Sequence, residues 1–212
     1  MLTVKEVYEA IDAFAPFASQ ESWDNSGLLV GGMAQPADRI LTTLDISEAI
    51  VAQAVAEQVQ LVVAHHPVIF SPLKTLPPDS PVYQLAAHGI AAICVHTPLD
   101  MAPLGLNTFA HTLLEKPLAL QGTQEVLEPS WTDGRGFGWI DTSARTWTPQ
   151  TLAQTLQTAF GEVRYSAAER SIRKIAYCSG SAASMLELAA AKGCDALITG
   201  DIKHDRWYAA EF

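Results

Sequence analysis

Basic residues, long apolar runs and paired cysteines are all scarce in this chain of 212 residues. Its 13 lysines and arginines are scattered among 23 acidic residues, and the formal net charge is −10. Without a basic patch to contact phosphates, nucleic acid is excluded as a partner. The longest apolar runs have the length of a strand, well short of the roughly 20 residues that span a membrane, so a membrane partner is excluded too.

The cysteine content and the N-terminus both predict a cytoplasmic protein. Cys94, Cys178 and Cys194 lie in apolar context and form no Cys-x-x-Cys pair, so we expect reduced thiols in the core. The first residues carry acids within a helical pattern and lack the apolar centre of a signal peptide. Thr3 and Glu6 make a capping box there, which predicts a helix near the start of the chain.

Two segments share one strand–helix–strand pattern. In the first, "RILTT" and "LVVA" flank the helix "EAIVAQAVAEQ", and in the second, "RKIAYC" and "ALIT" flank a helix that ends at Gly193. Placing Ile40 on Ile175 aligns both patterns without a gap, although any two unrelated βαβ units could produce such a match. "LVVAHH" then falls on "ALITGD", so polar pairs follow both strands where open α/β sheets bind ligands.

Residues 116–147 lack helical periodicity and contain Pro, Gly and three tryptophans, which predicts a domain connection or short strands. Thr148, Pro149 and Gly161 then have the order of an N-cap, a first helical residue and a stop signal. They predict a helix over about 149–160.

A pair of histidines, His65 and His66, follows an apolar strand and precedes Pro67. Alternation along a strand would point their side chains to opposite faces. Because Pro67 ends the strand, both rings can instead turn toward one cavity. The alternative is one histidine in the core and one facing solvent.

His96 and Asp100 follow the strand "AAICV" in a similar way, with a proline between them. Three imidazoles and a carboxylate suit a divalent transition metal such as Zn, Mn, Fe, Co or Ni. A carboxylate can bridge two ions, so His65, His66 and Asp100 could together hold a pair. His96 would be the catalytic proton carrier, since histidine titrates in the working pH range. The alternative for Asp100 is a cap of the following helix.

Other polar residues are weaker candidates, because each has an equally good structural explanation. The turn or cap candidates are Asp45, Asn25 and Asn107; the ordinary helical histidines are His88 and His111; and the residues that could approach the cavity are Asp201 and His204. The chain has no Walker sequence, Gly-x-Gly-x-x-Gly fingerprint or Gly-x-Ser-x-Gly elbow, which excludes the commonest nucleotide and serine-hydrolase sites.

Six blocks occur in order between about residues 23 and 204: "WDNSGLLVG", "TTLDIS", "VVAHHPVIF", "VHTPLD", "GLN" and "ALITGDIKH". Together they resemble the YbgI-like dinuclear-metal proteins, also called GTP cyclohydrolase 1 type 2 homologues. The resemblance implies two related three-layer α/β lobes, at 1–115 and 116–212, each built on a βαβ unit with a mostly parallel sheet. It also implies a toroidal homohexamer with two divalent metal ions per subunit.

The resemblance assigns roles to particular residues. His65, His66 and Asp100 match metal ligands of that family, and His96 lies close to its metals. The family pattern continues past the "TGD" block to a Gly-His-x-x-x-Glu-like segment whose His and Glu complete the site. Glu211 falls too early to be that acid, so we expect both ligands beyond residue 212. The alternative is a truncated site that keeps two His and one Asp, with solvent or partner groups in the remaining positions.

Two functions follow, and the sequence does not decide between them. The leading hypothesis is a metal-dependent hydrolase that acts through a metal-bound water on a small molecule, in the manner of a GTP cyclohydrolase. The alternative is a non-catalytic hexameric metal-binding scaffold or metal-handling protein. A purely structural α/β protein with incidental histidines is the third interpretation.

Overall fold

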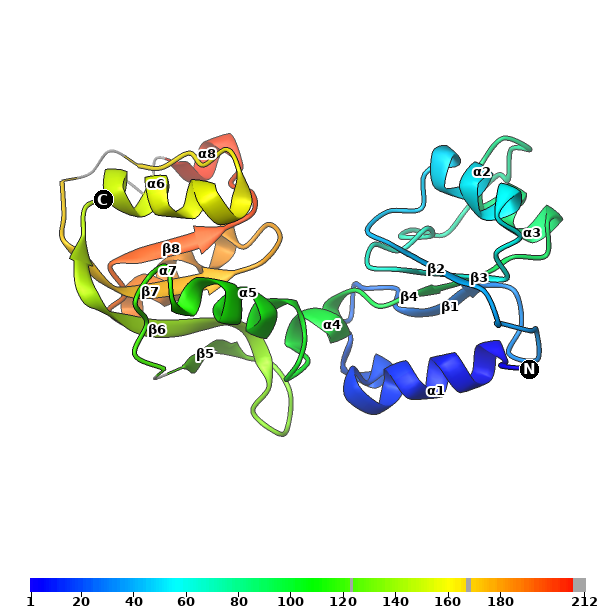
Figure 1. Ribbon diagram of the computed structural model, residues 1–212, viewed down its shortest axis with the longest axis horizontal. Helices are drawn as coiled ribbons and strands as arrows, with labels where there is room; N and C mark the ends of the chain where they lie inside the picture. The colour runs from blue at the N-terminus through cyan, green and yellow to red at the C-terminus, as the bar shows by residue number, and fades with distance from the viewer. Residues whose placement is uncertain (123, 167–168, 208–212) are drawn as a thin grey trace. The chain divides into compact units, whose positions relative to one another are not determined.

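The computed structural model describes residues 1–122, 124–166 and 169–207, so Glu211 lies outside the described residues. The chain divides into two compact units, Met1–Ala102 and Pro103–Phe212. Each contains a four-stranded sheet with helices, as Figure 1 shows, and the predicted α/β class is confirmed.

The first unit contains nine helices and strands within its described residues. In chain order they are α1 (Val4–Phe14), η1 (Phe17–Ser19), β1 (Gly27–Val30), β2 (Ile40–Thr43), α2 (Glu48–Ala56), β3 (Leu61–Ala64), α3 (Pro81–Ala87), β4 (Ala91–Cys94) and α4 (Thr97–Met101). The sheet order is β1-β4-β3-β2, in which β2, β3 and β4 are parallel and β1 is antiparallel to β4. The first predicted βαβ unit is therefore confirmed.

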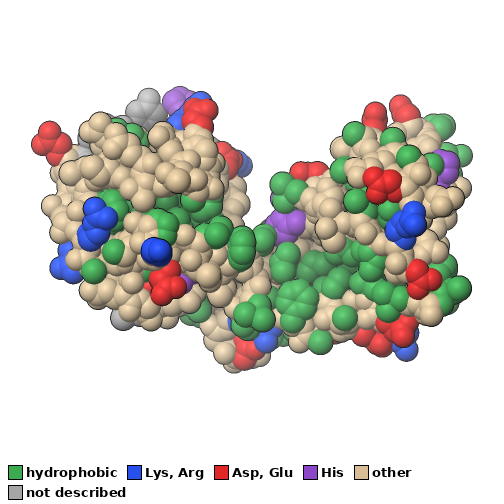
Figure 2. All heavy atoms as spheres, viewed as in Figure 1, with side chains coloured by type: hydrophobic (Ala, Val, Ile, Leu, Met, Phe, Trp, Pro, Cys, Tyr) green, Lys and Arg blue, Asp and Glu red, His purple; other side chains and the backbone are tan. Residues whose placement is uncertain are grey.

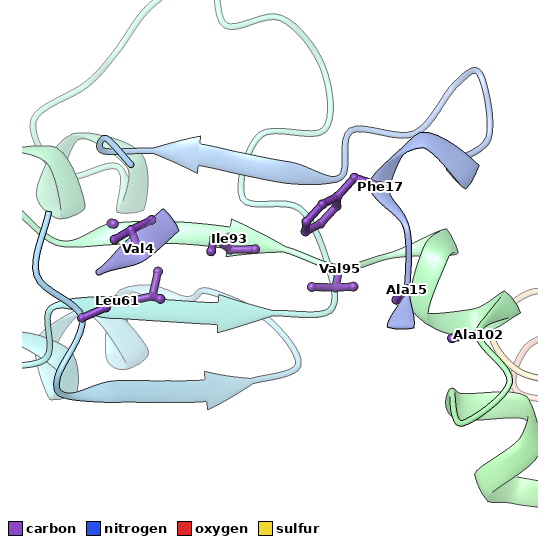
Figure 3. Close-up of a cluster of buried hydrophobic side chains, with 9 residues drawn as sticks. Val4, Ala15, Phe17, Leu61, Ile93, Val95 and Ala102 are labelled. Atoms are coloured by element: carbon purple, nitrogen blue, oxygen red, sulfur yellow. The ribbon is translucent and has the colours of Figure 1, made fainter. Parts of the chain in front are cut away.

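Helices pack through apolar side chains on both faces of this sheet, so the unit has three layers. On one face, Val4 of α1 lies against Leu61 and Ile93, as Figure 3 shows. On the other face, α2 and α3 pack against β3 and β4 (Figure 1). Full burial of each such side chain contributes about 1.5–3 kcal/mol. The capping box of Thr3 and Glu6 is present at the start of α1, as predicted.

The second unit also alternates helices and strands. Its elements are α5 (Leu106–Glu115), β5 (Glu125–Pro129), β6 (Gly136–Trp147), α6 (Pro149–Phe160), β7 (Ile172–Cys178), η2 (Ala183–Met185), α7 (Leu186–Ala191), β8 (Ala196–Thr199) and α8 (His204–Trp207). The strand order is β5-β6-β7-β8. Thr148 caps α6 and Gly161 ends it, as the sequence predicts.

The second sheet corrects one expectation. Only its β7–β8 pair is parallel, whereas β5–β6 and β6–β7 are antiparallel, so the sheet is not mostly parallel. The parallel pair is the predicted second βαβ unit, with Ile175 opposite Ala196. The segment that lacked helical periodicity supplies β5 and the long strand β6, which the direct connection between them makes antiparallel, whereas α6 lies between β6 and β7.

The boundary between the units lies at residues 102/103 rather than at 115/116. Helix α5 belongs to the second unit because its apolar face packs on the second sheet, where Leu114 lies in one core with Trp139. His111 of α5 also donates a hydrogen bond from Nε2 to Asp141 Oδ2 of β6, at 2.9 Å. Helix α7 covers the opposite face of this sheet.

Charged side chains are scattered on the surface shown in Figure 2, and hydrophobic side chains gather in a continuous area of the first unit. This face carries no basic patch, in agreement with the composition. Across residues 1–122, 124–166 and 169–207, no helix has both the length and the apolar character required to cross a membrane.

The pair of His111 and Asp141 predicts that the loss of His111 lowers the stability of the second unit. The Asp141 carboxylate is fully buried, and it also accepts hydrogen bonds from the backbone N–H groups of Gly122 and Thr142. We expect His111→Ala to lower the free energy of unfolding by about 1–3 kcal/mol, because a buried acceptor loses a side-chain donor. Urea unfolding measures the change. His88→Ala at the exposed end of α3 is the control, and an equal loss there would contradict the prediction.

Candidate metal centre

The parallel pairing of β3 and β4 brings the three candidate histidines to one edge of the first sheet. Ala64 at the end of β3 lies opposite Cys94 at the end of β4. His65 and His66 follow β3 directly, and His96 follows β4 two residues after its end. All three histidines therefore lie just past the carboxyl ends of parallel strands, as the sequence predicts.

The three imidazole rings face one another. Their centroids lie 4.9 Å apart for His65 and His66, 5.1 Å for His65 and His96, and 5.7 Å for His66 and His96. Each ring offers a nitrogen, and these three atoms all lie within 4.8 Å of one another. The alternative with one histidine in the core and one in solvent is therefore wrong, because Pro67 ends the strand and both rings turn the same way.

Each imidazole donates a hydrogen bond from Nδ1 to an oxygen of the protein. His65 donates to the carbonyl of Val95 at 3.0 Å, a group that can only accept. His66 and His96 donate to carboxylates, at 2.7 Å and 2.8 Å. A hydrogen on Nδ1 leaves the Nε2 lone pair of a neutral ring free to bind a metal ion.

The carboxylate next to His96 is Asp24, which the sequence did not reveal. Its side chain is fully buried, and it accepts hydrogen bonds from His96, from the hydroxyls of Ser26 and Thr97, and from backbone N–H groups. Burial alone would raise the pKa of Asp24, but these hydrogen bonds outweigh it and lower the pKa well below its ordinary value. The same bond, from Nδ1 to Asp24, raises the pKa of His96.

The antiparallel strand β1 explains how Asp24 reaches His96. Gly27 at the start of β1 pairs with Cys94 at the end of β4, so the loop that precedes β1 lies at the same edge as the loops that follow β3 and β4. The "WDNSG" block is this loop. Its run of Asp, Asn and Ser was the only sequence signal for the buried acid, and such a run is also typical of a turn.

Asp45 is the partner of His66. The sequence predicts a turn or cap residue at this position. In the structure Ser47 caps α2, and Asp45 accepts a hydrogen bond from His66 Nδ1. Unlike Asp24, this carboxylate is exposed, with 64% of its side chain accessible. The two carboxylates thus orient two imidazoles in opposite surroundings.

Asp100 lies within α4 and not at a helix cap, since Gly105 is the N-cap of α5. Its Oδ2 is 3.9 Å from His65 Nε2, so a carboxylate oxygen stands beside the imidazole group. Burial lowers the pKa of His65, and Asp100 opposes that change. A neutral His65 is the form that binds metals.

The weaker candidates have other places. Asn25 donates from Nδ2 to the carbonyl of Ile69 and so joins two loops of the first unit. His88 is the exposed C-cap of α3, and the other four candidates, Asn107, His111, Asp201 and His204, belong to the second unit. Asn107 is buried there and accepts from the backbone N–H of Ser179, which gives it a structural role.

The donor set fits a divalent transition metal. Three imidazole nitrogens are turned toward one space, their opposite nitrogens are held by oxygens, and a carboxylate stands beside them. Neutral imidazole with a hydrogen-bonded Nδ1 and a carboxylate are common ligands of Zn, Mn, Fe, Co and Ni. Among the residues that the structure describes, His65, His66 and His96 could thus hold a metal ion.

Comparison with known proteins gives consistent matches over nearly the whole chain. The sequence model of a family described as Duf34/NIF3 (NGG1p interacting factor 3) matches residues 2–212. A Helicobacter pylori protein named GTP cyclohydrolase 1 type 2 is 35% identical over 217 residues, covering 99% of this chain and 81% of that protein. A Streptococcus pneumoniae protein named GTP cyclohydrolase 1 type 2 homolog is 33% identical, covering 95% and 77%.

The fold is also found among solved structures. A Bacillus cereus protein described as related to NIF3 superimposes with a TM-score of 0.88 at 18% identity. The match covers 99% of this chain and 85% of that one. At this identity the likeness concerns the fold.

The burial of Asp24 predicts that its removal destabilises the first unit. Asp24→Ala leaves the buried N–H of Thr97 and the hydroxyl of Ser26 without their acceptor, and we expect a loss of about 2–3 kcal/mol in the free energy of unfolding. Asp45→Ala is the matched control, because it also removes a carboxylate from a histidine but at an exposed position. Urea unfolding compares the two. Equal stability of both variants would show that Asp24 has no structural role.

Proposed function

Since the chain belongs to the Duf34/NIF3 family, we propose that its first unit is the metal centre of a metal-dependent hydrolase. His65, His66 and Asp100 would hold the metal, and His96 would carry a proton. The observation that supports this most strongly is the common orientation of the three rings, each fixed through Nδ1 by an oxygen. A structural histidine needs no such shared orientation.

We propose two divalent ions per subunit, as the resemblance implies. A carboxylate can contact two ions at once, and the Oδ2 atom of Asp100 lies 3.9 Å from Nε2 of His65. His65, His66 and Asp100 would hold the ions. The donor set admits Zn, Mn, Fe, Co and Ni and does not select among them.

When bound, a divalent metal activates water at neutral pH and stabilises developing negative charge. The chain's own residues then orient and move protons. Asp24 holds the His96 ring by its Nδ1, so that Nε2 points into the space between the imidazoles. His96 can take a proton at Nε2 and return it, because Asp24 stabilises the protonated ring.

For the substrate we propose GTP, and for the reaction hydrolytic opening of its guanine ring. This proposal rests on the relatives at 33–35% identity, whose names include GTP cyclohydrolase 1 type 2. The chain covers about four-fifths of their length, including the block that carries His65 and His66. We also propose the toroidal homohexamer that the resemblance implies, and light scattering of the purified protein measures the subunit number.

Metal binding predicts a difference between two histidine variants. We expect His66→Ala to lower the affinity for Zn²⁺ by at least about 100-fold. The loss of a metal ligand weakens a site more than the loss of a residue that only hydrogen-bonds to a ligand. His88→Ala, in α3, is expected to bind Zn²⁺ as the wild type does. Isothermal titration calorimetry on protein stripped of metal measures both. Equal affinities of the wild type and His66→Ala would refute the proposed site.

His96 predicts a separation of turnover from metal binding. In His96→Ala we expect GTP hydrolysis to fall by about 10²–10⁴-fold while the metal content stays at the wild-type level, because a proton carrier is lost and a ligand is not. Chromatographic measurement of GTP consumption and metal analysis of the same samples give both values. If the metal is lost as well, then His96 is a third ligand. If the metal-loaded wild type shows no turnover, the result would favour the alternative function, a non-catalytic metal-binding scaffold.

A further inference from the structure

Two large aromatic side chains, one beside His96 and the other beside the first, have no role in the metal chemistry. Trp23 precedes the buried Asp24, and its ring lies 5.9 Å from that of His96 in an edge contact. Phe70, in the loop that follows β3, lies 6.2 Å from Trp23 with the rings tilted by 47°. Trp23 is 57% exposed and Phe70 is 53% exposed. Tryptophan usually buries most of its surface. Because both side chains are more than half exposed here, they contribute little to the core of the unit.

The spacing of the two rings is set by the hydrogen bonds of their neighbours. Asp24 is held by His96 and Thr97, which fixes the residue directly after Trp23. Asn25 donates to the carbonyl of Ile69, which fixes the residue directly before Phe70. Both aromatic side chains are therefore mounted on anchored backbone although they face solvent. Such preorganisation lowers the entropy cost of binding a ligand.

We propose that Trp23 and Phe70 form a stacking wall for the planar nitrogen heterocycle of the substrate, a purine in the proposed reaction. The wall rests on the proposed function, and it adds the part of the site that recognises the ring. Small-molecule sites combine aromatic walls with a few convergent polar groups, and here the polar groups are the three imidazoles next to Trp23. Stacking on an aromatic side chain holds a flat ring beside them.

The charges around the site act on the phosphates and not on the neutral ring. Without a metal, the carboxylates of Asp24, Asp45 and Asp100, which are hydrogen-bonded to the imidazoles or lie beside them, repel an anionic chain. Bound divalent ions would offset that negative charge. A neutral base presents two apolar faces in either state, so we expect metal-free protein to bind guanosine more tightly than GTP.

Equilibrium dialysis of guanosine, GTP and inorganic triphosphate against metal-loaded and metal-free full-length protein tests the wall. We expect Trp23→Ala to weaken guanosine and GTP binding by about tenfold or more, and Trp23→Phe to restore most of the affinity because a flat ring remains. Phe70→Ala is expected to weaken both ligands less. Tyr83→Ala, an exposed aromatic residue of α3, is the control and should change nothing.

The outcomes separate this proposal from the metal site. Unchanged guanosine affinity in Trp23→Ala overturns the wall, as does a wild type that binds inorganic triphosphate but not guanosine. Metal analysis of the same variant reports on the centre itself. Trp23→Ala that keeps its metal and loses guanosine supports the wall, whereas a wild type that binds guanosine but no metal overturns the metal centre alone.

Discussion

The hydrogen bond from each histidine Nδ1 to an oxygen is the interaction on which the site depends. It sets the tautomer of each ring and leaves Nε2 free in all three, while one nitrogen of each ring lies within 4.8 Å of the other two. The three acceptors differ. They are the backbone carbonyl of Val95, which directly follows β4, the exposed carboxylate of Asp45 and the buried carboxylate of Asp24. Because Val95 is placed by the β3–β4 register, a slip in that pairing would remove the acceptor of His65.

Much of this arrangement could be predicted from local patterns. The capping box at Thr3 marks the start of α1, and Thr148 marks that of α6, because caps are encoded within a few residues. The two βαβ units followed from apolar runs separated by helical periods, and their parallel pairs are present in both sheets. The position of His65 and His66 past a strand end followed from Pro67, whose ring cannot join the ladder.

Other features depend on contacts that no local pattern encodes. Asp24 became recognisable only in the fold, since its burial is sustained by donors about 70 positions away in the chain. The antiparallel pairs of the second sheet were missed because a strand's apolar alternation does not specify the direction of its neighbour. Likewise, the apolar face of α5 could not indicate which of two sheets it covers, and so the boundary was placed too late.

The reversed direction of β1 has a consequence for biosynthesis. Asp24 is 72 positions before His96, and β4, the strand with which β1 pairs, is the last strand of its unit to leave the ribosome. While β2, α2 and β3 can assemble as a local βαβ unit, β1 must wait with an unpaired edge. The three imidazoles can therefore reach this geometry only after about a hundred residues have emerged, when the first unit is complete.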